Sequence, residues 1–108
     1  MISFDTPKAG DTMTEIRRNT NDDRFEIDVD GGLAYVEYII DGDEITFTHT
    51  LVPKAAEGKG VAGKLAAAVM AYARSTKLRV IPKCPYIAAW LKKHREYDDI
   101  LHPEYREG

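Results

Sequence analysis

The residues with the clearest chemical use lie in one short segment, Gly-Lys-Gly-Val-Ala-Gly-Lys, at positions 58–64. Glycine carries no side chain, so a backbone rich in glycine can approach a phosphate closely. Helical spacing of apolar residues begins here, and the free N–H groups and positive dipole end of a helix N-terminus favour an anion. This glycine loop therefore predicts a site for a phosphate-bearing ligand, formed by Gly58, Lys59, Gly60, Val61, Ala62, Gly63 and Lys64.

Two known phosphate-binding motifs fit the glycine loop only in part. A dinucleotide-binding fingerprint turns directly from strand to helix and meets an acidic residue about 20 residues later. Here residues 53–57 intervene, and residues 81–84 read Ile-Pro-Lys-Cys. In a P-loop, the position of Leu65 would be a Ser or Thr that holds magnesium. The sequence therefore argues against a dinucleotide-dependent enzyme and against a nucleotide triphosphatase.

Cys84 and Tyr86 are candidate catalytic residues beyond the glycine loop. Cys84 follows a predicted strand, precedes a predicted helix and neighbours Lys83, and these features favour the thiolate. The competing interpretation is a small buried apolar residue, the common state of a free cysteine. Tyr86 could donate a proton to a thiolate, or it could pack its ring against the sheet.

His49 is the third candidate catalytic residue. Strict alternation places it on one strand face with Ile45, Phe47 and Leu51, which predicts a histidine among apolar neighbours. Imidazole titrates near neutrality, so His49 could also orient a substrate or relay a proton. The other histidines lack metal-ligand spacing with each other or with the cysteine, so no metal is predicted.

The charge distribution supports an anionic ligand. The net charge is −3, but between Gly58 and Arg95 there are nine lysines and arginines and no acidic residue. A solvated basic helix face is the plain interpretation, and recognition of an anion is the alternative.

Length and composition bound the class of protein. A chain of 108 residues with 44% hydrophobic and 31% charged residues predicts one globular domain, and no apolar run reaches the roughly 18 residues of a membrane span. A single cysteine forms no internal disulfide, and residues 1–10 carry no secretory or transit pattern, so a cytoplasmic location is expected. Residues 1–13 are predicted to be a flexible leader and residues 14–108 the domain.

The elements that must position these residues follow from periodicity. Alternation at residues 25–29, Leu33–Ile40 and Glu44–Val52 predicts three antiparallel strands, with an Asp-Gly hairpin turn between the last two. Helical spacing and short apolar runs predict three further elements, which are a helix at Val61–Thr76, a strand at Leu78–Ile81 and a helix at Tyr86–Lys93. A strand-helix-strand crossover joins parallel strands. The predicted fold is α/β (α+β): a mixed sheet with an antiparallel meander, a βαβ crossover and a C-terminal helix.

The glycine loop also resembles the acyl-coenzyme A pyrophosphate loop of the GNAT acetyltransferases, Gln/Arg-x-x-Gly-x-Gly/Ala, with Gly60 and Ala62 at its small positions. More specifically, the chain resembles the small single-domain GNAT-like N-acetyltransferases, described as YidJ-type or Gcn5-like. The likeness spans residues 24–97. It includes Thr-His-Thr-Leu-Val-Pro at 48–53, Val-Ile-Pro-Lys-Cys-Pro-Tyr at 80–86 and His-Arg-Glu-Tyr at 94–97.

The resemblance implies a GNAT fold and an acetyl-CoA-dependent N-acetyltransferase that needs no metal. The pantetheine would lie between the strands at 44–52 and 78–81, against Leu51 and Val52, with the pyrophosphate on the glycine loop and the thioester beside Cys84. Two residues depart from the family pattern. Glu57 replaces the usual Gln or Arg and would repel the ligand if it pointed inward, and Leu51 replaces an acidic residue found in many relatives.

The competing hypothesis is a non-catalytic module that binds coenzyme A, a partner protein or RNA through the basic segment. An acidic net charge and the lack of a clear aromatic platform argue against RNA. The sequence names neither the amine acceptor nor the oligomeric state.

Overall fold

The computed structural model describes residues 16–106, and the predicted leader at residues 1–13 lies outside them. Five strands form one sheet in chain order: β1 (Arg17–Asn19), β2 (Arg24–Val29), β3 (Gly32–Asp41), β4 (Glu44–Leu51) and β5 (Arg79–Pro82). The first three pairings are antiparallel, and β5 pairs with β4 in parallel. The predicted meander, mixed sheet and crossover are confirmed. Strand β1 was not predicted, because its Arg-Arg-Asn sequence has no apolar alternation.

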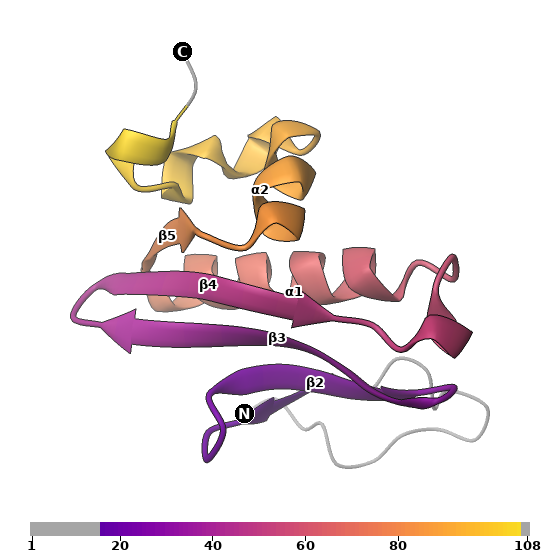
Figure 1. The fold of residues 1–108 in the computed structure, drawn as a ribbon. Coiled ribbons are helices and arrows are strands. Elements are labelled where there is room, and N and C mark those ends of the chain that lie inside the picture. Colours follow the sequence, from indigo (N-terminus) through magenta and orange to yellow (C-terminus); the bar gives the residue numbers. More distant parts are fainter. Residues whose placement is uncertain (1–15, 107–108) are drawn as a thin grey trace.

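The helices and short 3-10 turns are η2 (Lys54–Ala56), α1 (Val61–Thr76), α2 (Pro85–Lys92), η3 (Arg95–Ile100) and η4 (Pro103–Tyr105). Helix α1 lies behind the sheet, and no helix of the described chain stands in front of β2, β3 and β4 (Figure 1). We call that uncovered side the open face. The side chains fully buried between α1 and the sheet include Ile27, Val36, Phe47, Leu65 and Val69.

Strand β4 contains a β-bulge in its middle. Tyr38 of β3 pairs with Phe47, whereas the preceding residue of β3, Glu37, pairs with His49, so Thr48 is one residue extra. An extra residue reverses the alternation of side chains beyond it and bends the strand. The expectation that His49 shares a face with Ile45 and Phe47 is therefore wrong: those two are buried, and His49 is exposed on the open face.

Strands β4 and β5 separate at the bulge. Their parallel pairing runs from Glu44 with Arg79 to Phe47 with Pro82. The Cys84 N–H then donates to the Phe47 carbonyl at 2.8 Å, and the chain turns into α2. The second half of β4 therefore has strand β3 on one side and no strand of the described chain on the other. We call this opening the splay.

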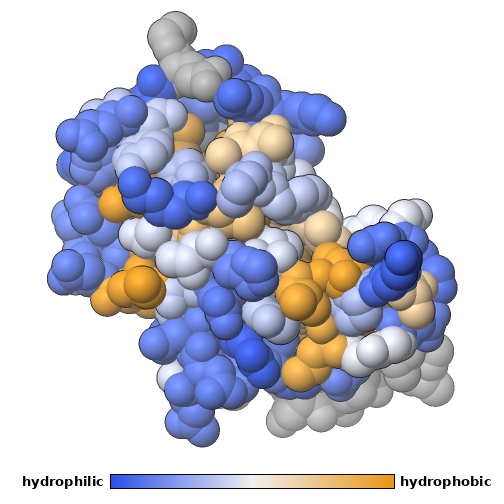
Figure 2. Space-filling model, viewed as in Figure 1, coloured by the Kyte–Doolittle hydropathy of each residue, from blue (hydrophilic) through white to orange (hydrophobic). Residues whose placement is uncertain are grey.

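The described part of the chain has no helix long and apolar enough to cross a bilayer. On the surface, apolar side chains gather in separate patches among hydrophilic ones (Figure 2). The large apolar residues most exposed are Ile39, Ile40, Leu51 and Tyr86.

Candidate functional site

The glycine loop opens α1 without a side-chain cap. Gly60 is the N-cap residue with φ 79°, and Gly58 has φ 82°, a left-handed conformation that side chains other than glycine rarely adopt. The first intrahelical bond runs from Lys64 N–H to the Gly60 carbonyl at 3.1 Å. The N–H groups of residues 61–63 therefore have no acceptor inside the helix, and no acidic residue stands in its first turn. This arrangement suits an anion.

Three charged residues of the loop region differ in what they contact. Lys59 Nζ lies 2.8 Å from Asp30 Oδ2, which ties the loop to the turn between β2 and β3. This hydrogen bond and the lysine charge hold the pKa of Asp30 below its ordinary value. Glu57 is exposed, and in the described residues no hydrogen bond joins its carboxylate to the loop amides. Lys64 lies in the first turn of α1 and is exposed.

Two polar groups of α2 converge on the glycine loop. A methyl group built on Gly63 would stand 3.9 Å from both Tyr86 Oη and Trp90 Nε1. These residues are four apart, so they share a helix face. Burial raises the pKa of Tyr86, so its hydroxyl stays a hydrogen-bond donor at neutral pH. Two side-chain donors thus reinforce the free amides of α1.

Beside these donors is an open hollow of about 480 Å³. Trp90 stacks on His94 with ring centres 3.8 Å apart and planes within 11°, and these two rings form part of the wall. The remaining lining residues are Gly60, Gly63, Lys64, Ala67, Glu96 and Tyr97. Neither Trp90 nor His94 was predicted to be a site residue. The spacing of Tyr86, Trp90 and His94, four residues each, was the signal that could have found them.

Cys84 lies at the splay and is 3% exposed. Its Sγ lies 3.1 Å from Thr50 Oγ1, and either atom can donate. Thr50 follows the bulge and pairs with the buried Val36, so it points to the α1 side of the sheet. Thr50 was not predicted, because an unbroken alternation would turn it the other way.

The remaining predicted site residues fall on two sides of β4. Leu51 is exposed on the open face, opposite Tyr35 in the register, and Val52 is half-buried against the core. His49 lies on the open face too, with its ring 6.2 Å from that of Tyr35. The structure thus brings Thr50 to Cys84 on one side of β4 and places His49 on the other.

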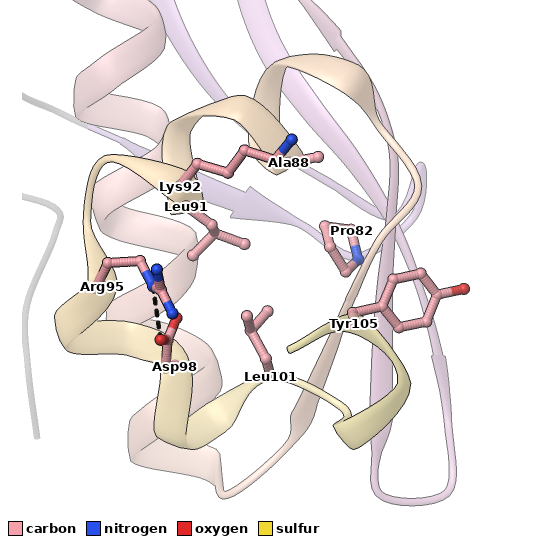
Figure 3. Close-up of a pocket in the computed structure, with 8 residues that line it drawn as sticks. All are labelled: Pro82, Ala88, Leu91, Lys92, Arg95, Asp98, Leu101 and Tyr105. Atoms are coloured by element: carbon pink, nitrogen blue, oxygen red, sulfur yellow. Dashed lines mark hydrogen bonds and ion pairs between the residues drawn. The ribbon is translucent and has the colours of Figure 1, made fainter. Parts of the chain in front are cut away.

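A second hollow, of about 260 Å³, lies on another side of α2. Leu91 and Leu101 line it, and Arg95 Nε donates to Asp98 Oδ2 at 2.7 Å across one wall (Figure 3). None of the predicted site residues lines this hollow. The candidate site is therefore the glycine loop, the faces of α2 and β4 beside it, and the splay.

A mixed sheet that splays beside a glycine-led helix is the arrangement that the resemblance to the GNAT acetyltransferases implies. A family model of GCN5-related N-acetyl-transferases matches residues 24–100, and the chain belongs to this family. Among solved structures, it is similar to a GCN5-like putative N-acetyltransferase from Staphylococcus aureus determined in solution by NMR. The TM-score is 0.67 and the identity 32%, over 84% of this chain and 90% of that chain. A search of curated proteins found no match.

Proposed function

We propose that this protein binds acetyl-CoA and transfers the acetyl group to an amine. The observation that carries the proposal is a coincidence of two features: the uncapped amides of residues 61–63 stand beside the splay that begins after Phe47 and Pro82. The first feature suits a diphosphate, and the second leaves a strand edge to which an extended chain can add. Coenzyme A has both parts, because an extended pantetheine chain is joined to its diphosphate.

Each part of the site would hold one part of acetyl-CoA. The amides of residues 61–63 would bind the pyrophosphate, with Lys64, Tyr86 and Trp90 adding donors. The edge of β4 from Thr48 to Leu51, with Val52 just after it, would align the pantetheine. The thioester would then lie in the splay beside Cys84.

Acetyl transfer requires few groups. The amine nitrogen attacks the thioester carbonyl carbon, a C–N bond forms and the C–S bond breaks. The proton lost by the nitrogen goes to a base, and the leaving sulfur takes up a proton. His49, exposed on the open face, is the base we propose, so that the acceptor enters from that side. Tyr86 Oη lies beside Gly63, so we assign Tyr86 to the pyrophosphate and not to the leaving thiolate.

Thermal denaturation tests cofactor binding. A ligand that binds the native state raises the midpoint by mass action. We expect stabilisation by acetyl-CoA without magnesium, and less by ATP, NADPH or an RNA oligonucleotide. A preference for NADPH would overturn the proposal, and stabilisation without turnover over a panel of amines would favour the non-catalytic module.

Labelled acetyl-CoA tests the role of Cys84. A nucleophilic Cys84 would carry the acetyl group as a thioester before the amine takes it. Wild type would then retain label after denaturation, and Cys84→Ala would not. Equal label in both proteins would remove the nucleophile role and leave direct transfer.

A further inference from the structure

The open face carries several carboxylates, and most of them have partners. Glu26 is buried and accepts from Arg24 Nε at 2.7 Å, and from Arg17 Nε and Asn19 Nδ2 at 3.2 Å each. Arg17 also forms two hydrogen bonds with Asp28. The negative charge on the β1 and β2 side of this face is thus compensated inside the protein.

Glu37 differs from these carboxylates. It is half-buried in β3, and its side chain forms no hydrogen bond or ion pair among residues 16–106. Its neighbour across β2 is Arg24, but that guanidinium bonds to Glu26 and lies 4.6 Å over the Tyr35 ring. The neighbour that could cancel the charge of Glu37 is therefore already occupied.

The other neighbour of Glu37 is His49. The two residues pair directly in the register of β3 and β4, so their side chains lie on the same face within contact range of one bound group. The bulge lies at this pair, and Thr48 Oγ1 donates to the Glu37 carbonyl at 3.4 Å. A carboxylate and an imidazole therefore stand together where β4 leaves β5.

We propose that Glu37 selects the acceptor, and that the acceptor class is an aliphatic amine bound as its ammonium cation. This inference rests on the proposed acetyl transfer. A carboxylate without an internal partner attracts an ammonium ion and accepts its hydrogen bonds. The ammonium nitrogen is held beside His49, which takes its proton before the nitrogen attacks the thioester carbon. Glu37 acts as a binding group, and an arylamine that is uncharged at neutral pH gains nothing from it.

Steady-state kinetics with two acceptors test this selection. Nα-acetyl-lysinamide carries an ammonium group at neutral pH, and 4-methoxyaniline is uncharged. In Glu37→Gln we expect the KM for the lysine derivative to rise about tenfold, the loss of one charge-assisted hydrogen bond. The kcat, the KM for acetyl-CoA and the KM for 4-methoxyaniline should stay within about twofold of wild type, because none of them depends on the carboxylate charge.

Asp28→Asn is the matched control, because it removes a carboxylate from the same face that already has a partner in Arg17. This variant should leave both acceptor KM values unchanged. An unchanged KM for the lysine derivative in Glu37→Gln, or an equal rise for 4-methoxyaniline, would overturn the assignment.

A binding measurement separates this inference from the proposed function. Nα-acetyl-lysinamide and its uncharged isostere Nα-acetyl-norleucinamide are titrated into the protein while amide NMR signals are followed. We expect the lysine derivative alone to shift the signals of residues 37 and 49, and Glu37→Gln to abolish the shift. If neither Nα-acetyl-lysinamide nor 4-methoxyaniline is acetylated while this shift is present, the proposed transferase is overturned and the cation site is kept. Equal shifts by the two titrated compounds would overturn the cation site.

Discussion

The two halves of β4 lie in one strand, yet they differ in pairing, in burial and in what they can bind. Residues 44–47 have strands on both sides, and Ile45 and Phe47 are fully buried. Residues 48–51 have a strand on one side only, with Leu51 39% exposed and His49 on the open face. One extra residue, Thr48, separates the halves. The comparison shows that residues 44–47 contribute to stability through pairing and burial, whereas residues 48–51 have, within the described chain, an unpaired edge to which a ligand can bind.

The largest expected effect is a loss of stability from a substitution in the buried half of β4. Phe47→Ala removes a fully buried ring, and such truncations cost about 3–5 kcal/mol in the free energy of unfolding. Leu51→Ala, in the other half of the strand, removes a side chain that is already partly in water and should cost under about 1 kcal/mol. Urea denaturation followed by circular dichroism measures both. Equal losses would show that the halves do not differ in stability.

Deletion of Thr48 should separate folding from binding. The residues on either side keep their partners and faces, because the register already treats Thr48 as extra. The strand would straighten, since bulges bend strands, and the splay beside β5 would narrow. We expect unfolding free energy within about 1 kcal/mol of wild type and acetyl-CoA affinity at least about tenfold weaker, roughly 1.4 kcal/mol.

Thr48→Ala is the control for the deletion, since it keeps the extra residue and loses only a long hydrogen bond to the Glu37 carbonyl. Calorimetric titration with acetyl-CoA measures both variants. Full affinity in the deletion variant would mean that the bulge has no part in the splay.

The glycine loop gives the next effect in size. Gly60→Ala places a side chain at φ 79°, which costs about 1–2 kcal/mol, and it should weaken acetyl-CoA binding through the displaced amides. Gly63→Ala is its matched control for stability alone, because Gly63 belongs to the same binding loop. It lies inside α1 with room for a methyl group, so stability should not fall. Thermal melts with and without acetyl-CoA compare the two; the same loss of stability in both would contradict the conformational reason.

Sequence patterns predicted the paired half of β4 and its surroundings well. Alternation located β2, β3 and β4 to within a few residues, and helical spacing located α1 and α2. The glycine loop was found because phosphate sites need small residues at a helix start, and those residues are local in sequence.

The periodicity of the sequence could not predict which way the side chains of residues 48–51 point. Nothing in Thr48-His49-Thr50 marks which residue is extra, because the bulge is defined by pairing with β3. His49 was therefore placed on the wrong face, and Thr50 and Glu37 were missed. Trp90 was missed for a similar reason, since its position beside Gly63 depends on how two helices pack.

The smallest expected effect concerns Glu26 on the open face and the pH dependence of stability. Glu26 pairs with Tyr35 across β2 and β3, and Tyr35 pairs with Leu51 across β3 and β4. Glu26 therefore lies in the cross-strand row of side chains that ends at Leu51, beside the splay. Burial alone would raise the pKa of Glu26, but hydrogen bonds from Arg24 and Asn19 and the charges of Arg17 and Arg24 hold that pKa below its ordinary value. A lowered folded-state pKa stabilises the protein above the unfolded-state pKa of about 4.3, and this stabilisation is lost as the pH falls through the folded-state pKa.

Glu26→Gln should therefore be about 1 kcal/mol less stable than wild type near neutral pH, and the difference should shrink as acid protonates the wild-type carboxylate. Urea midpoints for both proteins, measured at steps from neutral pH down to about pH 3, record this change. The glutamine side chain keeps the shape of the glutamate and one acceptor for Arg24, so the two proteins differ mainly in charge. A difference that stays constant over this range would show that packing, and not the ionised carboxylate, is what Glu26 contributes to the open face.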